Sequence, residues 1–226
     1  MKTVNEVMSE LKKLGTEQTR KTFARHGAPV DKMFGVKVGD MKVILKKIKG
    51  NQKLAMDLYA TGNTDAMYLA GLVADGALMS KKEIETWAKE AFWQMNSDFT
   101  VPWVACENAA GVELANKWIK SKETKLATTG WMTYASIVSN RPDEELDLGE
   151  IDSLLEKAVK EIHKVHDRVR YAMNNFVICV GSYVKPLSAR AKAAAKKIGV
   201  VNVDMGDTNG TVVVFARFRR RYRRGG

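Results

Sequence analysis

Three features of the sequence predict an all-α protein built from stacked helical hairpins. Apolar residues recur at steps of three and four along most of the 226 residues, rather than alternating as they do in strands. The chain contains only four prolines, which leaves long stretches free to be helical. Apolar hairpins follow one another at intervals of about 35 to 45 residues, the spacing of HEAT-type units. The expected fold is therefore an α-α superhelix of HEAT-like helical hairpins, an architecture that offers a concave face.

The first three helices are indicated by apolar stripes and by residues that end helices. Residues 4–14 place their apolar side chains on one stripe, and Gly15 is suited to end this helix. A second helix is expected over residues 16–25. After a loop that contains Gly27, Pro29 and Gly35, a third helix begins near Val38.

The same periodicity continues to residue 198 as pairs of helices. The expected ranges are 52–60, 64–74, 81–92, 103–108, 115–121, 124–139, 151–163, 167–180 and 187–198. The last of these is rich in alanine, which suits close packing between helices. An acidic connection that follows Pro142 separates the helix ending at residue 139 from the next one.

The C-terminal residues have the composition of a β-ribbon. Residues 200–203 and 211–215 are rich in valine, and Asn209-Gly210 between them is a strong hairpin signal. We therefore expect a helical-repeat domain over residues 1–199, a short β-hairpin over 200–218 and an arginine-rich tail over 219–226.

The charge balance favours a polyanion as the partner. The chain has 37 Lys and Arg against 26 Asp and Glu, a formal net charge of +11. Such a surplus suits nucleic acid or an acidic membrane face better than a neutral small substrate. No stretch reaches the roughly 18 apolar residues that a membrane span requires. Only two cysteines are present, Cys106 and Cys179, so we expect a protein of the reducing cytoplasm, neither exported nor inserted in a membrane.

The sequence lacks the motifs of several enzyme classes. It has no P-loop, no G-x-G-x-x-G motif and no serine in a nucleophile elbow. The sequence therefore gives no support to nucleotide hydrolysis or acyl transfer as the activity. His26, His163 and His166 are not spaced with cysteines or carboxylates as metal ligands are. We therefore expect neither a metal nor a cofactor. His26 is either a cation that interacts with the dipole at the C-terminal end of a helix, or a loop residue that contacts a phosphate group of a ligand.

Aromatic residues gather in the central third of the chain. These residues form either an apolar core or a cleft in which their rings contact a base or sugar of a ligand. For Trp87 and Trp118, which lie on amphipathic helices, the core is favoured. Trp103 and Glu107 are four residues apart on one predicted helix, so they share a face. Such a pair could stabilise a cationic sugar during N-glycosidic cleavage, or Glu107 could be an ordinary surface residue.

Several short segments resemble a known family. The segments are Arg25-His26-Gly27, Phe34-Gly35-Val36, 54–62, 66–70 and 117–126. Together they are similar to the AlkD-type DNA alkylation repair family, and the similarity covers residues 1–205. The resemblance implies a HEAT-like repeat protein whose concave face holds DNA, and whose active members release alkylated purines without a metal.

The resemblance also implies a pocket, which this chain carries in altered form. By this resemblance, Trp103 occupies a position where active members of the family have an aromatic residue, and Glu107 occupies the position of their catalytic aspartate. Phe176 occupies the position of a tryptophan in their cleft, and Trp131 is expected nearby. Thr128 replaces an arginine. Glutamate lengthens the acidic arm, and a shift on the order of 1 Å can cost about a hundredfold in rate. Loss of the arginine removes a cation that would hold a phosphate. The chain therefore resembles more closely the AlkF and AlkG branch, which are non-glycosylases that favour branched DNA and carry a β-hairpin.

The sequence leaves three functions open. The leading one is a monomeric DNA-binding protein of the bacterial cytosol, associated with the nucleoid, that recognises duplex shape, damage or branches through phosphate contacts. The candidate contact residues are Arg25, His26, Lys46, Lys47, Lys125, Arg168, Arg170, Arg217 and Arg219. The second is an active metal-free DNA N-glycosylase for 3-methyladenine or 7-methylguanine, with Glu107 as the catalytic carboxylate. The third is a scaffold that binds another protein and owes its charge to the tail.

Overall fold

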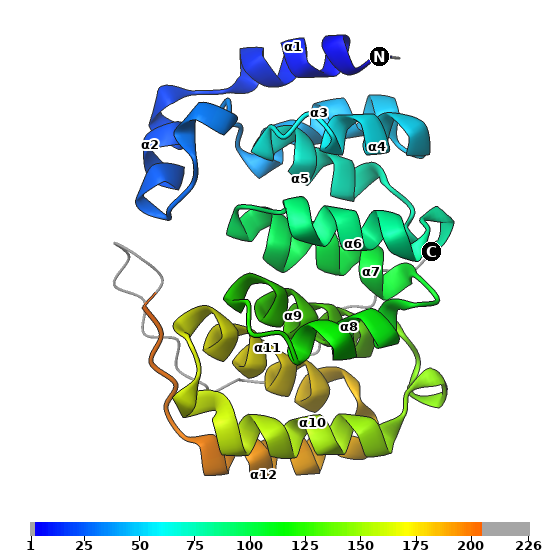
Figure 1. Cartoon of the computed structure of the whole chain (residues 1–226), viewed down its shortest axis with the longest axis vertical. Coiled ribbons are helices and arrows are strands. Elements are labelled where there is room, and N and C mark those ends of the chain that lie inside the picture. The colour runs from blue at the N-terminus through cyan, green and yellow to red at the C-terminus, as the bar shows by residue number, and fades with distance from the viewer. Residues whose placement is uncertain (1–2, 205–226) are drawn as a thin grey trace. The chain divides into compact units, whose positions relative to one another are not determined.

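The computed structural model describes residues 3–204, and these form two compact units whose boundary along the chain falls between Ala110 and Gly111. Within the described range every regular element is helical (Figure 1), so the all-α prediction is confirmed. We call residues 3–110 unit 1 and residues 111–204 unit 2, and we describe each unit by itself.

Unit 1 consists of short helices joined by tight turns. In chain order they are α1 (Val4–Leu14), α2 (Glu17–Arg25), η1 (Val30–Lys32), α3 (Val38–Ile48), α4 (Gln52–Tyr59), α5 (Thr64–Val73), η2 (Gly76–Leu78), α6 (Lys81–Glu90), the π-helical turn η3 (Asn96–Thr100) and α7 (Val101–Glu107). Side-chain caps set several of the starts: Thr3 and Ser80 each form a capping box with a glutamate three residues on. Asn63 accepts from two amides at the start of α5.

The core of unit 1 is centred on α5. Nearly every residue of α5 is buried, and α3, α4, η3 and α7 pack against it. Tyr59 on α4 is fully buried, stacks on Trp87 with ring centroids 3.9 Å apart, and donates its hydroxyl to the Trp87 carbonyl oxygen at 2.7 Å. This contact ties α4 to α6 and confirms the expectation that Trp87 belongs to the core.

Unit 2 contains longer helices. They are α8 (Gly111–Ile119), α9 (Thr124–Asn140), η4 (Asp143–Glu145), α10 (Leu148–Glu161), η5 (Ile162–Lys164), α11 (Asp167–Tyr183), η6 (Lys185–Leu187) and α12 (Ser188–Ile198). The pair α9 and α11 forms the centre, α8 packs on α9, and α10 and α12 pack on each other and on α11. Trp118 is buried here, as expected.

A glycine allows α8 and α9 to approach closely. A Cβ atom at Gly130 would lie 2.5 Å from the backbone nitrogen of Ile119 and 2.9 Å from the carbonyl oxygen of Ala115. Both distances are shorter than van der Waals contact, so only glycine fits at this crossing without a shift of backbone.

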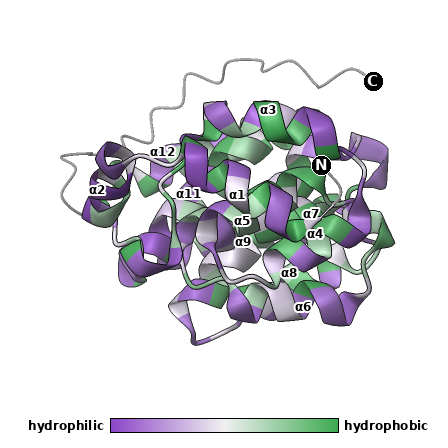
Figure 2. Ribbon diagram, turned by 90° about the horizontal axis from the view of Figure 1, so that it is seen from above, coloured by the Kyte–Doolittle hydropathy of each residue, from purple (hydrophilic) through white to green (hydrophobic). Residues whose placement is uncertain are grey.

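Most of the predicted helices are found within a few residues of their expected bounds. The helix at 4–14 and the start near Val38 are reproduced, while the helix expected at 115–121 begins earlier, at Gly111. The turn η3 was not predicted; it runs directly into α7, so the helix expected from residue 103 begins at Val101. Seen from above, α2 is hydrophilic along most of its length (Figure 2), and Thr19 is its one buried residue.

The predicted hairpin at 200–218 is not seen in the part of the chain that the structure describes. Residues 200–204 form no strand, and the rest of the predicted hairpin and the arginine-rich tail lie outside residues 3–204. Val201 and Val203 are buried, whereas Asn202 and Asp204 are exposed. The valine-rich pattern therefore marks a half-buried segment, whose backbone groups are bound by side chains of α11 rather than by a neighbouring strand.

Each helix within residues 3–204 is too short or too polar to span a membrane.

Candidate nucleic-acid interface

The positive charge of unit 1 is concentrated at its start. Residues 1–50 contain twelve Lys or Arg and five Asp or Glu, whereas residues 51–110 contain four and eight. The structure exposes Arg25 at the end of α2 and both Lys46 and Lys47 in the last turn of α3. Within residues 3–204 none of these three cations forms an ion pair, so their charges are available to a polyanion.

His26 directly follows α2 and is partly exposed. Its amide donates to the Phe23 carbonyl oxygen at 2.9 Å, which makes His26 the C-cap residue of the helix. Gly27 follows with a φ of +74°, a conformation that favours glycine. The Arg25-His26-Gly27 motif is therefore a helix end, and its side chains reach solvent beside the negative end of the α2 dipole.

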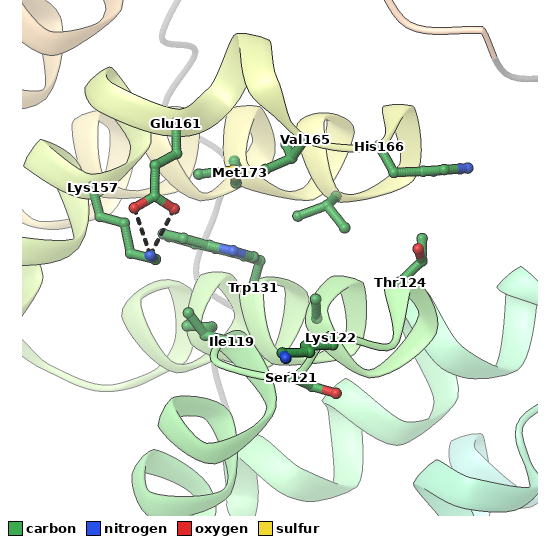
Figure 3. A pocket seen from close by; sticks show the side chains of 12 residues that line it. Ile119, Ser121, Lys122, Thr124, Trp131, Lys157, Glu161, Val165, His166 and Met173 are labelled. Carbon is green, nitrogen blue, oxygen red and sulfur yellow. Dashed lines mark hydrogen bonds and ion pairs between the residues drawn. The ribbon is translucent and has the colours of Figure 1, made fainter.

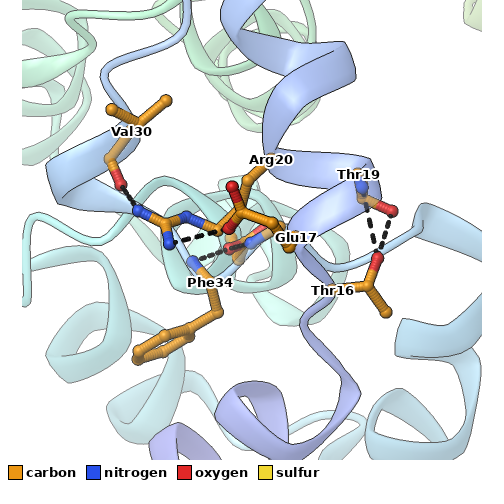
Figure 4. Close-up of polar contacts among 8 residues, drawn as sticks. Thr16, Glu17, Thr19, Arg20, Val30 and Phe34 are labelled. Carbon is orange, nitrogen blue, oxygen red and sulfur yellow. Dashed lines mark hydrogen bonds and ion pairs between the residues drawn. The ribbon is translucent and has the colours of Figure 1, made fainter.

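Arg20 fastens α2 to the loop that follows it (Figure 4). Its guanidinium donates to the Val30 carbonyl oxygen at 2.9 Å and pairs with Glu17 at 3.2 Å. At the start of the helix, Thr16 accepts from the Thr19 amide at 3.2 Å. These contacts hold the basic end of α2 in a defined place although the helix has almost no buried face.

A buried carboxylate explains the Phe34-Gly35-Val36 motif. Asp65, near the start of α5, accepts backbone N–H bonds from Phe34 at 2.7 Å, Gly35 at 3.0 Å and Val36 at 3.2 Å. Burial raises the pKa of Asp65, and the three N–H bonds oppose this rise. Gly35 has a φ of +79°, and a Cβ there would lie 2.4 Å from Arg20 Cγ. The motif is therefore structural: it wraps the chain around the Asp65 carboxylate.

The three unit 2 candidates differ in how far the fold already engages them. Lys125 in the first turn of α9 and Arg168 in the first turn of α11 are partly exposed. Both take part in interactions within the protein. They remain predicted DNA contacts, but they are less free than the cations of α2 and α3.

Arg170 has a structural role in unit 2. Its guanidinium donates to the carbonyl oxygens of Ile162 at 3.1 Å, Val165 at 3.1 Å and Asn202 at 2.7 Å, and it pairs with Asp167 at 2.7 Å. A phosphate could bind this side chain only at the expense of contacts that hold the segment after α12 in place. Arg217 and Arg219 lie outside the described residues.

Trp103 and Glu107 both lie on α7, as expected, but the carboxylate is already bound. Glu107 Oε2 accepts from the Gly76 amide at 2.9 Å, and Asn108 donates to the carbonyl oxygens of Gly76 and Met79, each at 2.7 Å. The two side chains form a clamp that holds η2 against α7. Burial of the carboxyl group and the nearby Asp75 raise the pKa of Glu107, while the Gly76 N–H opposes them.

Trp103 is partly exposed among other aromatic rings. Its centroid lies 5.3 Å from that of Tyr68 in an edge-on arrangement and 6.1 Å from that of Phe99. Of the predicted pocket residues, Trp103 is partly exposed and Glu107 is exposed.

The other predicted pocket residues belong to unit 2 and are buried. Thr128 is 1% exposed and donates its hydroxyl to the Thr124 carbonyl oxygen at 2.8 Å. Phe176 is 0% exposed and packs edge-on against Trp131, with centroids 5.3 Å apart. The predicted pocket residues thus belong to different units: Trp103 and Glu107 lie on α7 of unit 1, while Thr128 and Trp131 lie on α9 and Phe176 on α11 of unit 2.

Sequence reasoning missed Asp65 and a cavity beside Trp131. The Phe34-Gly35-Val36 motif was recognised, but its partner is about thirty residues away, and no local pattern links the two. Within residues 3–204 no group of three or more His, Cys, Asp or Glu side chains could hold a metal ion.

The fold and the basic end of unit 1 together define a helical-repeat protein with a candidate nucleic-acid interface. A family model described as "DNA alkylation repair enzyme" matches residues 7–191, and the chain belongs to that family. This result confirms the family resemblance that the sequence motifs indicate.

Two curated relatives match over nearly their whole length. They are the Listeria innocua protein Lin0241, 31% identical over 215 residues, and the Listeria monocytogenes protein Lmo0209, 30% identical over 214 residues. In each case 92% of this chain and 92% of the relative are covered, and both carry the name "uncharacterized protein".

A similar solved structure is described as "a new family of proteins related to the HEAT-like repeat DNA glycosylases with affinity for branched DNA structures". It is 40% identical, with a TM-score of 0.84, and the match covers 89% of this chain and 86% of the other. This likeness confirms the predicted HEAT-like repeat.

Proposed function

We propose that this protein binds branched DNA through contacts to the phosphate backbone and has little or no glycosylase activity. The observation that carries the proposal is the 40% identical solved structure, which belongs to proteins with affinity for branched DNA. We further infer that the chain is a member of the AlkF and AlkG branch of the family, and that it acts as a monomer on DNA in the bacterial cytosol, at the nucleoid.

The basic end of unit 1 supports phosphate recognition. Arg25, Lys46 and Lys47 are exposed and make no ion pair within residues 3–204, so binding DNA would break no salt bridge of theirs. Contacts of this kind neutralise phosphates and release counterions, and they carry no base sequence information. They suit a protein that recognises the shape of DNA.

The position of Glu107 supports the absence of glycosylase activity. A catalytic carboxylate must face the sugar whose positive charge it stabilises. Here the Gly76 amide donates to Glu107 Oε2, so one carboxylate oxygen is already engaged in a hydrogen bond that holds η2 in place. Phe176 is fully buried and cannot line an open cleft as it stands.

Charge reversal tests the DNA surface. We expect Lys46→Glu with Lys47→Glu to weaken binding to a four-way junction by at least about tenfold, because each lost phosphate contact also becomes a repulsion. The matched control is Lys196→Glu with Lys197→Glu, which makes the same change in charge on exposed lysines of α12. Equal losses in the two double variants would reduce the effect to net charge and contradict a contact surface on α3.

A base-release assay tests the rival function. The protein is incubated with duplex DNA that contains 7-methylguanine or 3-methyladenine, and the free base is measured. We expect no release above the uncatalysed rate. Fast release that Glu107→Gln abolishes, with the thermal stability of the variant unchanged, would establish the metal-free N-glycosylase instead.

A further inference from the structure

Unit 2 contains a cavity of about 260 Å³ (Figure 3). It lies where the end of α8 and the start of α9 meet the end of α10 and the start of α11. Lys122, Thr124, Trp131 and Val165 are among its lining residues. All its lining residues belong to unit 2, and of the predicted pocket residues only Trp131 is among them.

One side of the cavity is built to receive an anion. The Lys122 ammonium is exposed, and neither it nor the Thr124 hydroxyl has a hydrogen-bond partner or counter-ion within residues 3–204. Both side chains stand at the start of α9, whose N-cap residue Glu123 supplies no side-chain cap. The positive end of a seventeen-residue helix adds to the charge of Lys122, and the exposed carboxylate of Glu123 opposes it.

The remaining charged groups of the lining do not cancel this field. Glu161 forms an ion pair with Lys157 at 2.6 Å, and Figure 3 shows this pair beside the Trp131 indole. His166 accepts from the Arg168 amide at 3.2 Å through Nδ1, and in Figure 3 its ring extends away from the other side chains. Lys122 thus remains the one lining cation without an acidic partner among the residues described.

The other walls are apolar. Trp131, Val165, Val169 and Met173 contribute apolar surface from α9 and from the start of α11. Of these four residues Val165 is partly exposed, whereas Trp131 is only 1% exposed and packs against Phe176. A ligand for this cavity must therefore combine an anionic group with a compact apolar body.

We propose that this cavity binds a single nucleotide, with its phosphate at Lys122 and Thr124 and its base against the apolar wall. The volume lies just below the roughly 300 Å³ at which pockets for drug-sized ligands begin, which fits one nucleotide unit and excludes a longer segment. The nucleotide is either free or the terminal, unpaired unit of a DNA branch. Only the second source rests on the proposed function.

Binding of small probes tests the cavity directly. Amide chemical shifts of the full chain are followed by NMR while deoxyadenosine monophosphate, deoxyadenosine or inorganic phosphate is added. We expect the monophosphate to bind most tightly of the three and to shift amides at 121–127 and 165–169. Equal affinity for inorganic phosphate and the monophosphate, or shifts confined to other residues, would overturn the proposal.

Two variants locate the contacts. Lys122→Ala should weaken binding of the monophosphate about tenfold, the loss typical of a hydrogen bond to a charged group. Lys120→Ala removes another exposed lysine, one outside the lining, and should change the affinity for the monophosphate less than about twofold. Ala127→Leu fills the cavity and should abolish the binding of deoxyadenosine. The melting temperature of this variant should be unchanged or higher. Equal effects of Lys122→Ala and Lys120→Ala would overturn the assignment.

The source of the nucleotide is decided with DNA. The affinity for a DNA flap that ends in a 5′-phosphate is compared with the affinity for the same flap without the phosphate. Both affinities are measured for the unchanged protein and for the Lys122→Ala variant. A preference for the phosphorylated flap that Lys122→Ala removes supports the DNA source. Binding of the free monophosphate without that preference supports a free nucleotide, and absence of both overturns the cavity proposal. Affinity for unphosphorylated junctions is measured in parallel, because its loss would contradict the proposed function and leave the cavity result standing.

Discussion

Asp65 shows how a single side chain can organise a segment that looks functional in the sequence. Its two carboxylate oxygens accept three backbone N–H bonds from the Phe34-Gly35-Val36 segment. The N–H groups of Gly35 and Val36 are buried with it, so they have no access to water as an alternative acceptor. The segment that the family resemblance singles out therefore has a structural partner within unit 1.

We predict that Asp65→Ala destabilises the protein on the order of 3 kcal/mol or more, because a buried donor left without a partner costs about 1–3 kcal/mol. The free energy of unfolding is measured by urea titration followed by circular dichroism. Asp57→Ala is the control, since Asp57 is an exposed partner of Lys53 and should cost less than about 1 kcal/mol. Similar losses in the two variants would contradict the role given to Asp65.

The residue scale also shows what the sequence could not reveal. Trp103 and Glu107 share a helix, as their spacing of four indicates. The hydrogen bond from Gly76 to Glu107 joins residues 31 apart, and the contacts of Arg170 with residue 202 span 32. Spacing predicts which side chains share a helix face, but it carries no information on partners brought together by tertiary packing.

At the scale of elements, α8 and α9 depend on the absence of a side chain. We predict that Gly130→Ala destabilises unit 2 by about 1–3 kcal/mol, because the new Cβ would meet the backbone of Ile119 at 2.5 Å and force the helices apart. Gly149→Ala on α10 is the matched control: its Cβ would meet only Asp147 Oδ1 at 3.4 Å. The control should be neutral or stabilising by up to about 1 kcal/mol, since alanine favours a helix. Thermal melts of both variants decide the matter.

Two tyrosines tie helices together and make stability depend on pH. Tyr59 joins α4 to α6 through the Trp87 carbonyl, and Tyr134 on α9 donates to Glu150 on α10. Burial raises the pKa of both phenols in the folded protein, and Glu150 raises that of Tyr134 further. The folded state therefore keeps protons that the unfolded chain loses above about pH 10.

We predict that the two tyrosines make their full contribution to the free energy of unfolding below about pH 10. This contribution falls as the pH rises above about 10. The variant Tyr59→Phe with Tyr134→Phe should lose about 1 kcal/mol per hydrogen bond at neutral pH and show a weaker decline at alkaline pH. Urea titrations at pH 8 and pH 11 measure both effects. An unchanged alkaline decline in the double variant would refute the assignment to these tyrosines.

Helices were easier to predict than the C-terminal segment for a physical reason. An amphipathic helix such as α1 satisfies its own backbone, so its apolar stripe and caps are both local, and its bounds agree with the prediction. The valines at 200–203 indicate burial, but burial alone does not decide what binds the backbone. Arg170 and Asp167 supply those hydrogen bonds in residues 202–204, and no strand forms there.

At the scale of the whole molecule, charge distribution is the feature most relevant to function. Residues 1–50 hold far more cations than anions, whereas the next sixty residues hold more anions than cations. A family match over residues 7–191 and a relative with affinity for branched DNA make a phosphate surface the simplest account of this asymmetry. The charge balance of the sequence favours a polyanion, and the structure distinguishes exposed cations such as Lys46 from engaged ones such as Arg170.

The central claim is tested most directly by comparing a four-way DNA junction with a linear duplex of the same total length over a series of salt concentrations. We predict at least about tenfold tighter binding to the junction, and a log–log slope against salt near −5, as expected when about six phosphates are neutralised. Equal affinity for the two DNAs, or an affinity that does not respond to salt, would contradict recognition of branched DNA through its phosphates.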